Sequence, residues 1–318
     1  MHERLSHGAI PREISLVIPA HDERDVLPAT LQAIVDQDFD GEIDIIVVAN
    51  GCTDDTVDVA RAFEAAARRC GHRLTVCELA ASSKPAALNH GDEEKRFDCT
   101  MYLDADVVLS SNAIDGVYRA LHGDRPVPIA APRLEVAPPH SRVTRSYGRV
   151  WSRIPYIERR VRGVGCYAVS AAGRARWRKY PDLMADDRFA RLHFRADEQQ
   201  LVQGASYSWP LPEGARELVR VRARWLLGNH ELRKARPDLS RNEDRRYEGL
   251  FGFVATHPWL WPDVLVFVGV YGFALARMAL KRRKGDRTWD RAVRARRVRL
   301  GTTPSTVKFS FRDGRLNE

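Results

Sequence analysis

The sequence predicts an α/β protein in which a mostly parallel sheet is flanked by helices, with a helical extension at the C-terminus. Apolar runs typical of buried strands alternate with amphipathic segments over roughly the first 110 residues, and this alternation is typical of parallel βαβ units. The chain has 318 residues, of which 44% are hydrophobic, so it can bury a large core.

Four strands are predicted in this first part, each an apolar run of the kind that is buried on both faces of a sheet. They are Ile14–Pro19, Ile43–Ala49, Leu74–Leu79 and a fourth run that ends in Asp104. Apolar side chains recur at helical spacing over Leu27–Val35 and predict the first helix. A second helix should run to about Cys70. A third should cover Lys84–Asn89, because a proline occupies its first turn.

Two carboxylates follow the fourth strand in the segment TMYLDADVVLS. Asp104 and Asp106 are two residues apart, so on an extended segment they point to the same side and can reach one divalent ion or the phosphates and ribose of a nucleotide. A solvated turn is the alternative interpretation of this pair, since Asp is common in turns.

Polar turns follow the predicted strands at Ala20, Asn50, Ser83 and Asp104. Ligands of parallel sheets bind at the carboxyl ends of the strands, so these turns predict one crevice. Neither a GxGxxG nor a GxxxxGK[ST] pattern occurs there, which argues against the dinucleotide-binding and P-loop classes.

The cysteines are five in number and contain no C-x-x-C pair, which argues against a disulfide framework and against a zinc site. Free thiols fit a reducing cytosol. The first twelve residues are polar and lack the apolar core of a signal peptide, so we expect the protein to be cytoplasmic.

The formal net charge of +9 is concentrated near the C-terminus. Eleven lysines and arginines lie between Arg277 and Arg299 against two aspartates, and the rest of the chain is balanced. A charge confined to a tail favours a segment beside an anionic membrane over a nucleic-acid-binding domain, so no nucleic-acid partner is expected.

An apolar segment precedes this basic run. Val264–Ala276 carries no charge, and Trp259 and Trp261 lie just before it, as in segments at a membrane interface. A span needs roughly 20 apolar residues. The sequence therefore favours a helix that lies in the plane of the inner face of the cell membrane, with a packed soluble helix and a true span as alternatives.

Four segments occur in a characteristic order: VIPAHDERDVLPATLQAI, VVANGCTDDTVDVA, SKPAALNHG and YLDAD. They resemble the ordered motifs of family 2 glycosyltransferases, which have the GT-A fold, and the resemblance covers about Ile14 to Arg233. It implies a GT-A domain at 1–250, with a nucleotide-binding half at about 12–110 and an acceptor half at about 111–250. Residues 251–318 form the extension with the apolar helix and the basic tail.

The resemblance implies a nucleotide-sugar site at the strand ends. Its members here are Pro19, Ala20, His21, Glu23, Asn50, Lys84, Asp104 and Asp106. His21 stands where Tyr is frequent in the family, and Asp22 stands where Asn is usual. Asn50 takes the place of an Asp that contacts uracil in the family's Asp-Asp-Gly-Ser pattern, and its amide still offers a donor and an acceptor.

A metal is part of what the resemblance implies. Asp106, with Asp104 beside it, would ligate Mn²⁺ or Mg²⁺ at the donor diphosphate, and Lys84 would offset phosphate charge. In LMADDRFA, Asp186 and Asp187 occupy the place of the family's Glu-Asp pair, whose second acid is the general base of inverting members. The resemblance thus implies Asp187 as the base, while an acidic helix start is the structural alternative.

Further donor or acceptor contacts are implied at Gly165, Arg224 and Trp225. Gly165 belongs to a predicted strand at 163–170, for which tight core packing is the alternative. Arg224 and Trp225 resemble the end of the Q-x-x-R-W sequence of processive synthases, or else belong to a solvated basic helix. Val221 stands where that sequence has Gln, so we expect transfer of a single sugar.

These observations predict an inverting, metal-dependent glycosyltransferase. Its expected donor is a UDP-sugar and its expected acceptor is a hydroxyl of a glycan, a glycolipid or a natural product, including a lipid-linked one. One alternative is a GT-A-like nucleotidylyltransferase, which requires a glycine-rich basic loop where this chain has PAHDERD. The other is a non-catalytic membrane-associated scaffold, which has no physical need for Asp104, Asp106 and Asp187.

Overall fold

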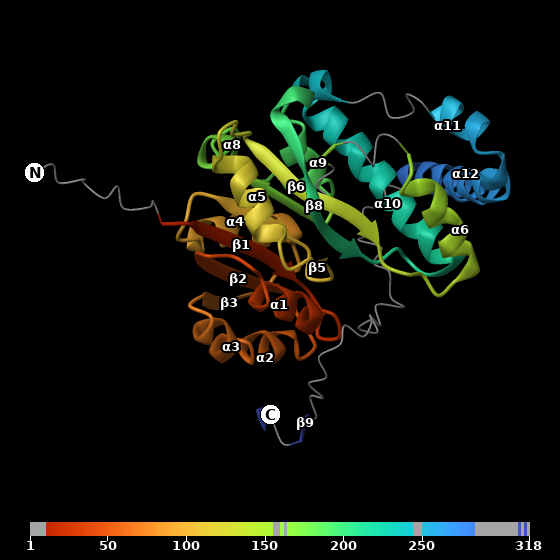
Figure 1. The fold of residues 1–318 in the computed structure, drawn as a ribbon. Helices are drawn as coiled ribbons and strands as arrows, with labels where there is room; N and C mark the ends of the chain where they lie inside the picture. The colour runs from red at the N-terminus through yellow and green to blue at the C-terminus, as the bar shows by residue number, and fades with distance from the viewer. Residues whose placement is uncertain are drawn as a thin grey trace, which may run out of the picture.

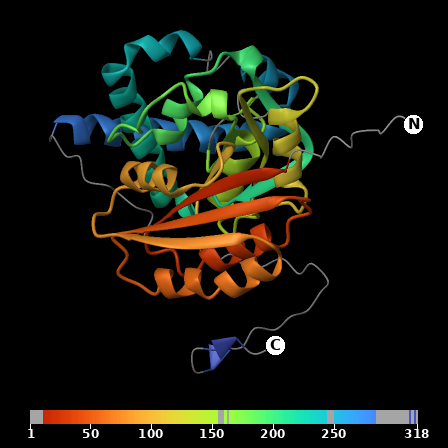
Figure 2. The same cartoon turned by 90° about the vertical axis from the view of Figure 1, so that its left-hand side faces the viewer.

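The computed structural model describes residues 11–154, 160–161, 164–243, 250–283, 311–312 and 315–316. Within these ranges, one sheet of eight strands runs through the molecule in the order β3-β2-β1-β4-β7-β6-β8-β5, and helices cover both of its faces (Figure 1). Figure 2 shows the first strands between α4 on one face and the α2 and α3 pair on the other.

The first half of the sheet is parallel, as predicted. Its strands are β1 (Glu13–Ala20), β2 (Glu42–Asn50), β3 (Arg73–Leu79) and β4 (Thr100–Leu103). Its helices are α1 (Leu27–Val35), α2 (Thr56–Arg61), α3 (Glu64–Arg69) and α4 (Lys84–Glu94). The helix predicted up to Cys70 is interrupted by a turn at Ala62 and Phe63, and α4 extends five residues beyond the predicted Asn89.

The packing of α4 on β1 depends on Gly91. A Cβ at this position would lie 2.3 Å from Cγ1 of Val17, so only glycine allows the helix to approach the strand this closely.

The second half of the sheet makes the whole sheet mixed, because β7 runs antiparallel to both β4 and β6, while β6 and β8 are parallel and β5 is antiparallel to β8. The strands are β5 (Val108–Leu109), β6 (Ile129–Val136), β7 (Cys166–Val169) and β8 (Gln199–Trp209). The helices are α5 (Ala113–His122), α6 (Arg142–Trp151), α8 (Ala171–Arg174), α9 (Asp186–Arg191), α10 (Gly214–Ala235), α11 (Leu250–Thr256) and α12 (Trp261–Arg283). Short 3-10 turns occur at Ala196–Glu198, Pro237–Asn242 and Pro258–Leu260, and a small antiparallel pair is formed by β9 (Phe311–Arg312) and β10 (Arg315–Leu316).

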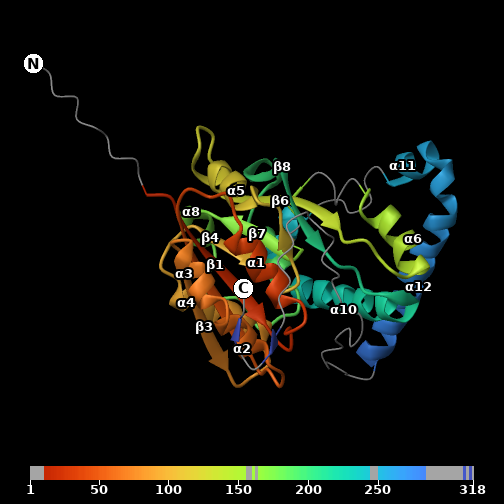
Figure 3. The ribbon, with the colours of Figure 1, turned by 60° about the horizontal axis from the view of Figure 1, so that its bottom comes forward.

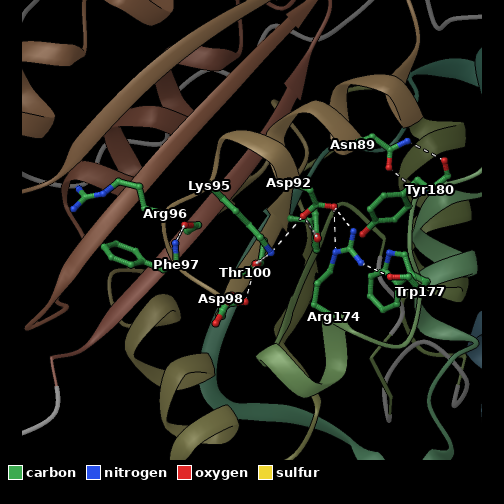
Figure 4. Close-up of polar contacts among 12 residues, drawn as sticks. Asn89, Asp92, Lys95, Arg96, Phe97, Asp98, Thr100, Arg174, Trp177 and Tyr180 are labelled. Atoms are coloured by element: carbon green, nitrogen blue, oxygen red, sulfur yellow. Dashed lines mark hydrogen bonds and ion pairs between the residues drawn. The ribbon is translucent and has the colours of Figure 1, made fainter.

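A polar network joins the two halves at the C-terminal end of α4 (Figure 4). Asp92 accepts hydrogen bonds from Tyr102 Oη at 2.7 Å and from Nε and Nη2 of Arg174 at 3.1 and 2.6 Å. Lys95 lies 3.6 Å from the same carboxylate. Asn89 exchanges two hydrogen bonds with the backbone of Tyr180. These contacts fix α4, and with it Lys84 at the other end of the helix.

Helix α12 packs on α6 and α10 along one face (Figures 1 and 3). Phe267, Val270 and Ala274 are buried at helical spacing in this contact. Asp263, 7% exposed, is bound by Arg149 of α6 through two bonds of 2.7 and 2.5 Å and by Ser146 at 2.6 Å, and this pairing lowers the pKa of Asp263.

The other face of α12 is apolar and exposed. It carries large side chains that are between 38% and 75% exposed, including Leu265, Val268, Phe273, Leu275 and Leu280, and Trp261 begins the helix. The stretch Pro258–Arg282 is long and apolar enough to cross a membrane by length and composition alone. The sequence analysis considered a helix on the membrane surface and a helix packed in the protein as separate alternatives. The structure combines features of both, because α12 packs on one face and exposes an apolar face. The basic residues from 284 to 299 lie outside the described residues.

Candidate active site

The turns that follow β1 and β2 lie side by side and are tied together by Asn50. Its side chain is 3% exposed, and its Nδ2 donates to the carbonyls of Ala20 at 2.7 Å and Val48 at 3.3 Å. His21 Nδ1 donates to the Asn50 carbonyl at 2.5 Å. Both amide hydrogens of Asn50 are therefore used within the chain in this geometry, and Oδ1 is an acceptor. The predicted contact between Asn50 and a base stays a prediction.

A cluster of charge lies beside these turns, where β4, α4 and α9 begin or end. Lys84 is the first residue of α4, whose N-terminus is capped by Ser83. The Lys84 ammonium lies 2.7 Å from Asp104 Oδ1 and 3.0 Å from Asp186 Oδ2. Asp187 is the next residue of α9, and its Oδ1 accepts the backbone N–H of Arg188 at 2.6 Å. The carboxylates of Asp104 and Asp186 thus contact the Lys84 ammonium, and that of Asp187 lies near enough to act on it electrostatically.

The grouping of charged side chains shifts the pKa values of Lys84 and Asp187. Burial lowers the pKa of Lys84, but the carboxylates of Asp104, Asp186 and Asp187 outweigh it and raise that pKa above its ordinary value. Burial also raises the pKa of Asp187 to about 7, and the Asp186 carboxylate adds to this rise while Lys84 opposes it. A carboxylate with a pKa near neutrality is suited to general-base chemistry.

Gly165 contributes through its backbone. It has a φ of +70°, and a Cβ there would lie 3.0 Å from Val107 Cγ2. Its carbonyl accepts the N–H of Asp104 at 2.8 Å, which holds that acid at the end of β4. The neighbouring Gly163 of the predicted strand lies outside the described residues.

A cavity of about 200 Å³ opens from the acid cluster toward α10 and α12. Most of the predicted site residues line it, namely Lys84, Asp104, Asp106, Gly165, Asp186, Asp187, Arg224 and Trp225. Pro19 lines a smaller space beside it together with Lys84 and Asp104. Ala20, His21, Glu23 and Asn50 are not among the lining residues and lie at the adjacent strand ends and turns, where the backbone N–H of Glu23 donates to Thr56 Oγ1 at 2.8 Å.

Arg222, from the same helix as Arg224, also lines the cavity. The rest of the wall was missed by sequence reasoning and includes both polar and apolar side chains, among them Arg188, Arg191, Asn229, Trp151, Trp209, Leu226 and Phe267. The rings of Trp151, Trp209 and Trp225 lie 5.9 to 6.3 Å apart between centroids. Trp151, Trp209 and Phe267 come from three distant elements, so no spacing in the sequence could have joined them.

The acids at the end of β4 fit a hard divalent cation. Asp106 is 5% exposed and lines the cavity together with Asp104, and carboxylate oxygens are the ligands that Mg²⁺ and Mn²⁺ prefer. The donor set therefore matches the metal that the sequence led us to expect.

Comparison with known proteins agrees with this geometry. A family model described as "Glycosyltransferase like family 2" matches residues 11–201. The chain belongs to this family. As a member of glycosyltransferase-like family 2, the protein is an enzyme of the glycosyltransferase class. No curated protein matches the sequence.

Comparison with solved structures identifies the fold of this family 2 chain. The mannosyltransferase PcManGT from Pyrobaculum calidifontis, in complex with GDP-Man and Mn²⁺, is similar over 85% of this chain and 75% of its own, with a TM-score of 0.53 and 17% identity. TarS of S. aureus is similar over 66% of this chain but 38% of its own, with a TM-score of 0.48 and 15% identity. The glucosyl-3-phosphoglycerate synthase of Mycobacterium tuberculosis, with Mn²⁺ and UDP, has 20% identity, a TM-score of 0.34 and coverages of 51% and 58%. The similarity to PcManGT and the order of the strands identify the GT-A fold.

Proposed function

We propose that this family 2 enzyme transfers one hexose from a nucleotide-diphosphate sugar to an acceptor hydroxyl, with inversion at the anomeric carbon. The observation that carries the proposal is the cavity in which Asp104 and Asp106 face Lys84, Asp186 and Asp187. We propose a UDP-sugar as the donor. PcManGT holds GDP-Man and Mn²⁺, which supports a sugar nucleotide and a divalent cation as ligands of this fold.

Asp104 and Asp106 would hold Mn²⁺ or Mg²⁺, a Lewis acid that stabilises the charge that leaves with the nucleotide diphosphate. Lys84 already lies 2.7 Å from Asp104, so its ammonium is positioned to neutralise a phosphate oxygen. The turns with Pro19, Ala20, His21, Glu23 and Asn50 would take the nucleoside.

Asp187 acts on the acceptor. It removes the hydroxyl proton as the bond between the anomeric carbon and the phosphate oxygen breaks and the new bond forms on the opposite face. Asp186 holds Lys84 at 3.0 Å and so keeps the ammonium beside the reacting groups. Because burial raises the pKa of Asp187 to about 7, this carboxylate is a better proton acceptor than an exposed Asp.

The test is a donor screen in which release of nucleotide diphosphate is followed with UDP-, GDP- and dTDP-sugars. Chelation should abolish release, and Mn²⁺ or Mg²⁺ should restore it. Asp106→Asn should weaken nucleotide binding in the presence of metal without lowering the melting temperature. Full activity in excess chelator contradicts the metal, and a product with the configuration of the donor contradicts inversion.

We propose a lipid-linked hydroxyl as the acceptor and the cytoplasmic face of a membrane as the location. Phe267 of α12 lines the cavity, and the opposite face of the same helix exposes Leu265 and Phe273. The acceptor half at about 111–250 and the extension at 251–318 would then work together. Arg222 and Arg224 on the cavity wall suit a phosphate between the lipid and the sugar.

Flotation with vesicles tests this location. Full-length protein should float with anionic vesicles, and less so at high salt. Leu265→Glu with Phe273→Glu should abolish flotation, because both side chains are more than 70% exposed and their loss leaves the packing of α12 intact. A matched control changes exposed Ala65 and Ala81 to Glu. Equal flotation of the two double variants would contradict a role for this face.

Membership of the glycosyltransferase family argues against both alternatives raised by the sequence, the nucleotidylyltransferase and the non-catalytic scaffold. A nucleotidylyltransferase would join a nucleoside triphosphate to a sugar 1-phosphate and release pyrophosphate, which a pyrophosphate assay with UTP and a sugar 1-phosphate would detect. A scaffold would bind vesicles without turnover.

A further inference from the structure

Three side chains with metal-ligand chemistry meet next to the acid cluster but outside its cavity. A ring nitrogen of His21, a carboxylate oxygen of Asp22 and Sγ of Cys52 all lie within 4.8 Å of one another. His21 and Asp22 follow β1, and Cys52 follows β2. Because these strands are parallel neighbours, their C-terminal turns bring the three ligands together.

Hydrogen bonds orient two of these ligands. Thr53 donates to Asp22 Oδ1 from its backbone N–H at 2.7 Å and from its hydroxyl at 3.2 Å. The second oxygen, Oδ2, lies 3.6 Å from His21 Nε2. Asp22 has a φ of +51°, a conformation that Asp tolerates better than most residues, and this turn directs its carboxylate back toward the histidine.

The tautomer of His21 is set by its other nitrogen. Nδ1 lies 2.5 Å from the Asn50 carbonyl, which can only accept, so the ring proton is on Nδ1. The neutral ring therefore has its lone pair on Nε2, which lies 3.6 Å from Asp22 Oδ2 and accepts a hydrogen bond from the Ser82 hydroxyl at 3.4 Å, so a metal would displace this hydroxyl. Metal-bound histidines are oriented in the same way, by donation of the second N–H to a carbonyl or a carboxylate.

Cys52 reaches the group because Gly51 precedes it. Gly51 has a φ of +61°, and a Cβ there would lie 2.8 Å from the backbone nitrogen of Ser82. The tight turn brings the Cys52 thiol beside the end of β1, where Sγ lies 3.6 Å from the carbonyl of Ala20.

We propose that His21, Asp22 and Cys52 bind one zinc-class divalent cation. Imidazole, carboxylate and thiolate with a water molecule form a known type of four-coordinate zinc shell. Sulfur and nitrogen ligands favour Zn²⁺ and Co²⁺ over Mg²⁺ and Mn²⁺, which prefer the all-oxygen acids at the end of β4. On binding, the Cys52 thiol loses its proton to solvent, and the ligand atoms approach to roughly 3.5 Å from one another.

The cation also competes with the nucleotide, a consequence that rests on the proposed function. The metal would lie within the turns assigned to the nucleoside, because His21 is bonded to Asn50. Occupancy of this site therefore lowers the affinity for the nucleotide, so that zinc inhibits the enzyme.

Cobalt provides the test. Full-length protein is titrated with Co²⁺ in excess Mg²⁺ and a thiol-free reductant, so that Mg²⁺ occupies the acids. One equivalent of Co²⁺ should give a sulfur-to-cobalt charge-transfer band that Zn²⁺ removes. Cys52→Ser should abolish the band, and His21→Gln should weaken Co²⁺ binding at least about tenfold. Cys77→Ser is the matched control, a partly buried thiol on the neighbouring strand β3, and should keep the band.

Each result bears on a separate part of the proposal. A wild-type protein without the band, or a band that survives in folded Cys52→Ser, overturns the site. Asp106→Asn should keep the band, and its loss there would also overturn the site. For the competition, UDP affinity in Mg²⁺ should fall on addition of Zn²⁺ in the wild type and stay constant in Cys52→Ser. An unchanged affinity in the wild type overturns the competition, whereas a protein that binds the cobalt but no nucleotide contradicts the proposed function instead.

Discussion

Helix α4 carries a cluster of charges at each end, and the two clusters differ in balance. At the C-terminal end, Asp92 is met by Arg174, Lys95 and the hydroxyl of Tyr102. At the N-terminal end, the Lys84 ammonium lies beside Asp104 and Asp186, and burial together with the Asp186 carboxylate raises the pKa of Asp187. The first cluster pairs one carboxylate with an arginine and a lysine, whereas the second groups three carboxylates near Lys84 at the wall of the cavity.

The difference separates a structural site from a chemical one. A buried carboxylate with its own arginine is satisfied within the chain and stabilises the contact between the two halves. Carboxylates that are grouped in a buried site perturb one another's pKa, and such perturbed acids are concentrated at functional sites. We therefore expect substitutions at the two ends of α4 to have opposite signatures.

The largest effect is expected at Asp187. Asp187→Asn should lower the turnover number by about 10² to 10⁴, the scale for loss of a positioned base, and leave nucleotide affinity within a few fold. Steady-state kinetics and calorimetry measure the two quantities. Asp186→Asn is the companion variant. If it loses turnover while Asp187→Asn is nearly silent, the base is assigned to the wrong acid.

Substitutions in the cluster around Asp92 should lower the stability of the protein. Arg174→Ala leaves the Asp92 carboxylate without two hydrogen bonds and should cost about 2–4 kcal/mol in the free energy of unfolding, as for other interrupted buried pairs. Urea unfolding gives this value. Turnover measured well below the melting temperature should change little. A stable but inactive Arg174→Ala would show that this end of α4 also serves the reaction.

The raised pKa of Asp187, caused first by burial, also predicts how stability depends on pH in metal-free protein. The pKa of Asp187 is raised to about 7 in the folded state, above its unfolded value. The native state thus binds the extra proton, and its stability falls as pH rises through the interval from about 4 to 7. Asp187→Asn removes this loss, so at pH 8 it should be more stable than the wild type by more than about 1 kcal/mol. Equal stability of the two proteins at pH 5 and pH 8 would contradict the raised pKa.

The smallest effect is expected for an ion pair on the outside of the same helix. Lys179 and Glu93 lie 2.8 Å apart, but their side chains are 71% and 57% exposed. Lys179→Ala should leave both the midpoint of urea unfolding and the turnover number unchanged, since solvent screens such pairs. It serves as the control for Arg174→Ala.

Much of the first half of the sheet could be predicted from the sequence, because the patterns that indicate its strands and turns lie within short segments. Each buried strand is an apolar run, and each turn that follows it is polar, so β1 to β4 and the acids at the end of β4 follow from pattern alone. The extra length of α4 was missed because its last turns are stabilised by distant partners, such as Arg174 on Asp92.

The second half depends on contacts across long separations in the sequence. The strand predicted at 163–170 is found as β7 (Cys166–Val169), but its antiparallel pairing with β4 and the wall formed by Trp151, Trp209 and Phe267 have no periodic signature. The group of His21, Asp22 and Cys52 was missed for the same reason. A search for spaced cysteines detects ligands on one segment, whereas these ligands lie on two turns that only the parallel sheet brings together.

Helix α12 contributes to two surfaces. Its Phe267 lines the cavity, and its other face exposes apolar side chains. Thermodynamic linkage follows from this arrangement. If a ligand in the cavity shifts Phe267, it changes the free energy of binding through the exposed face, and surface binding must change the ligand affinity by the same factor. A rigid helix fixed by Asp263 and Arg149 can transmit such a shift without any change in the sheet. The affinity for acceptor measured with and without vesicles would then report the strength of this coupling directly.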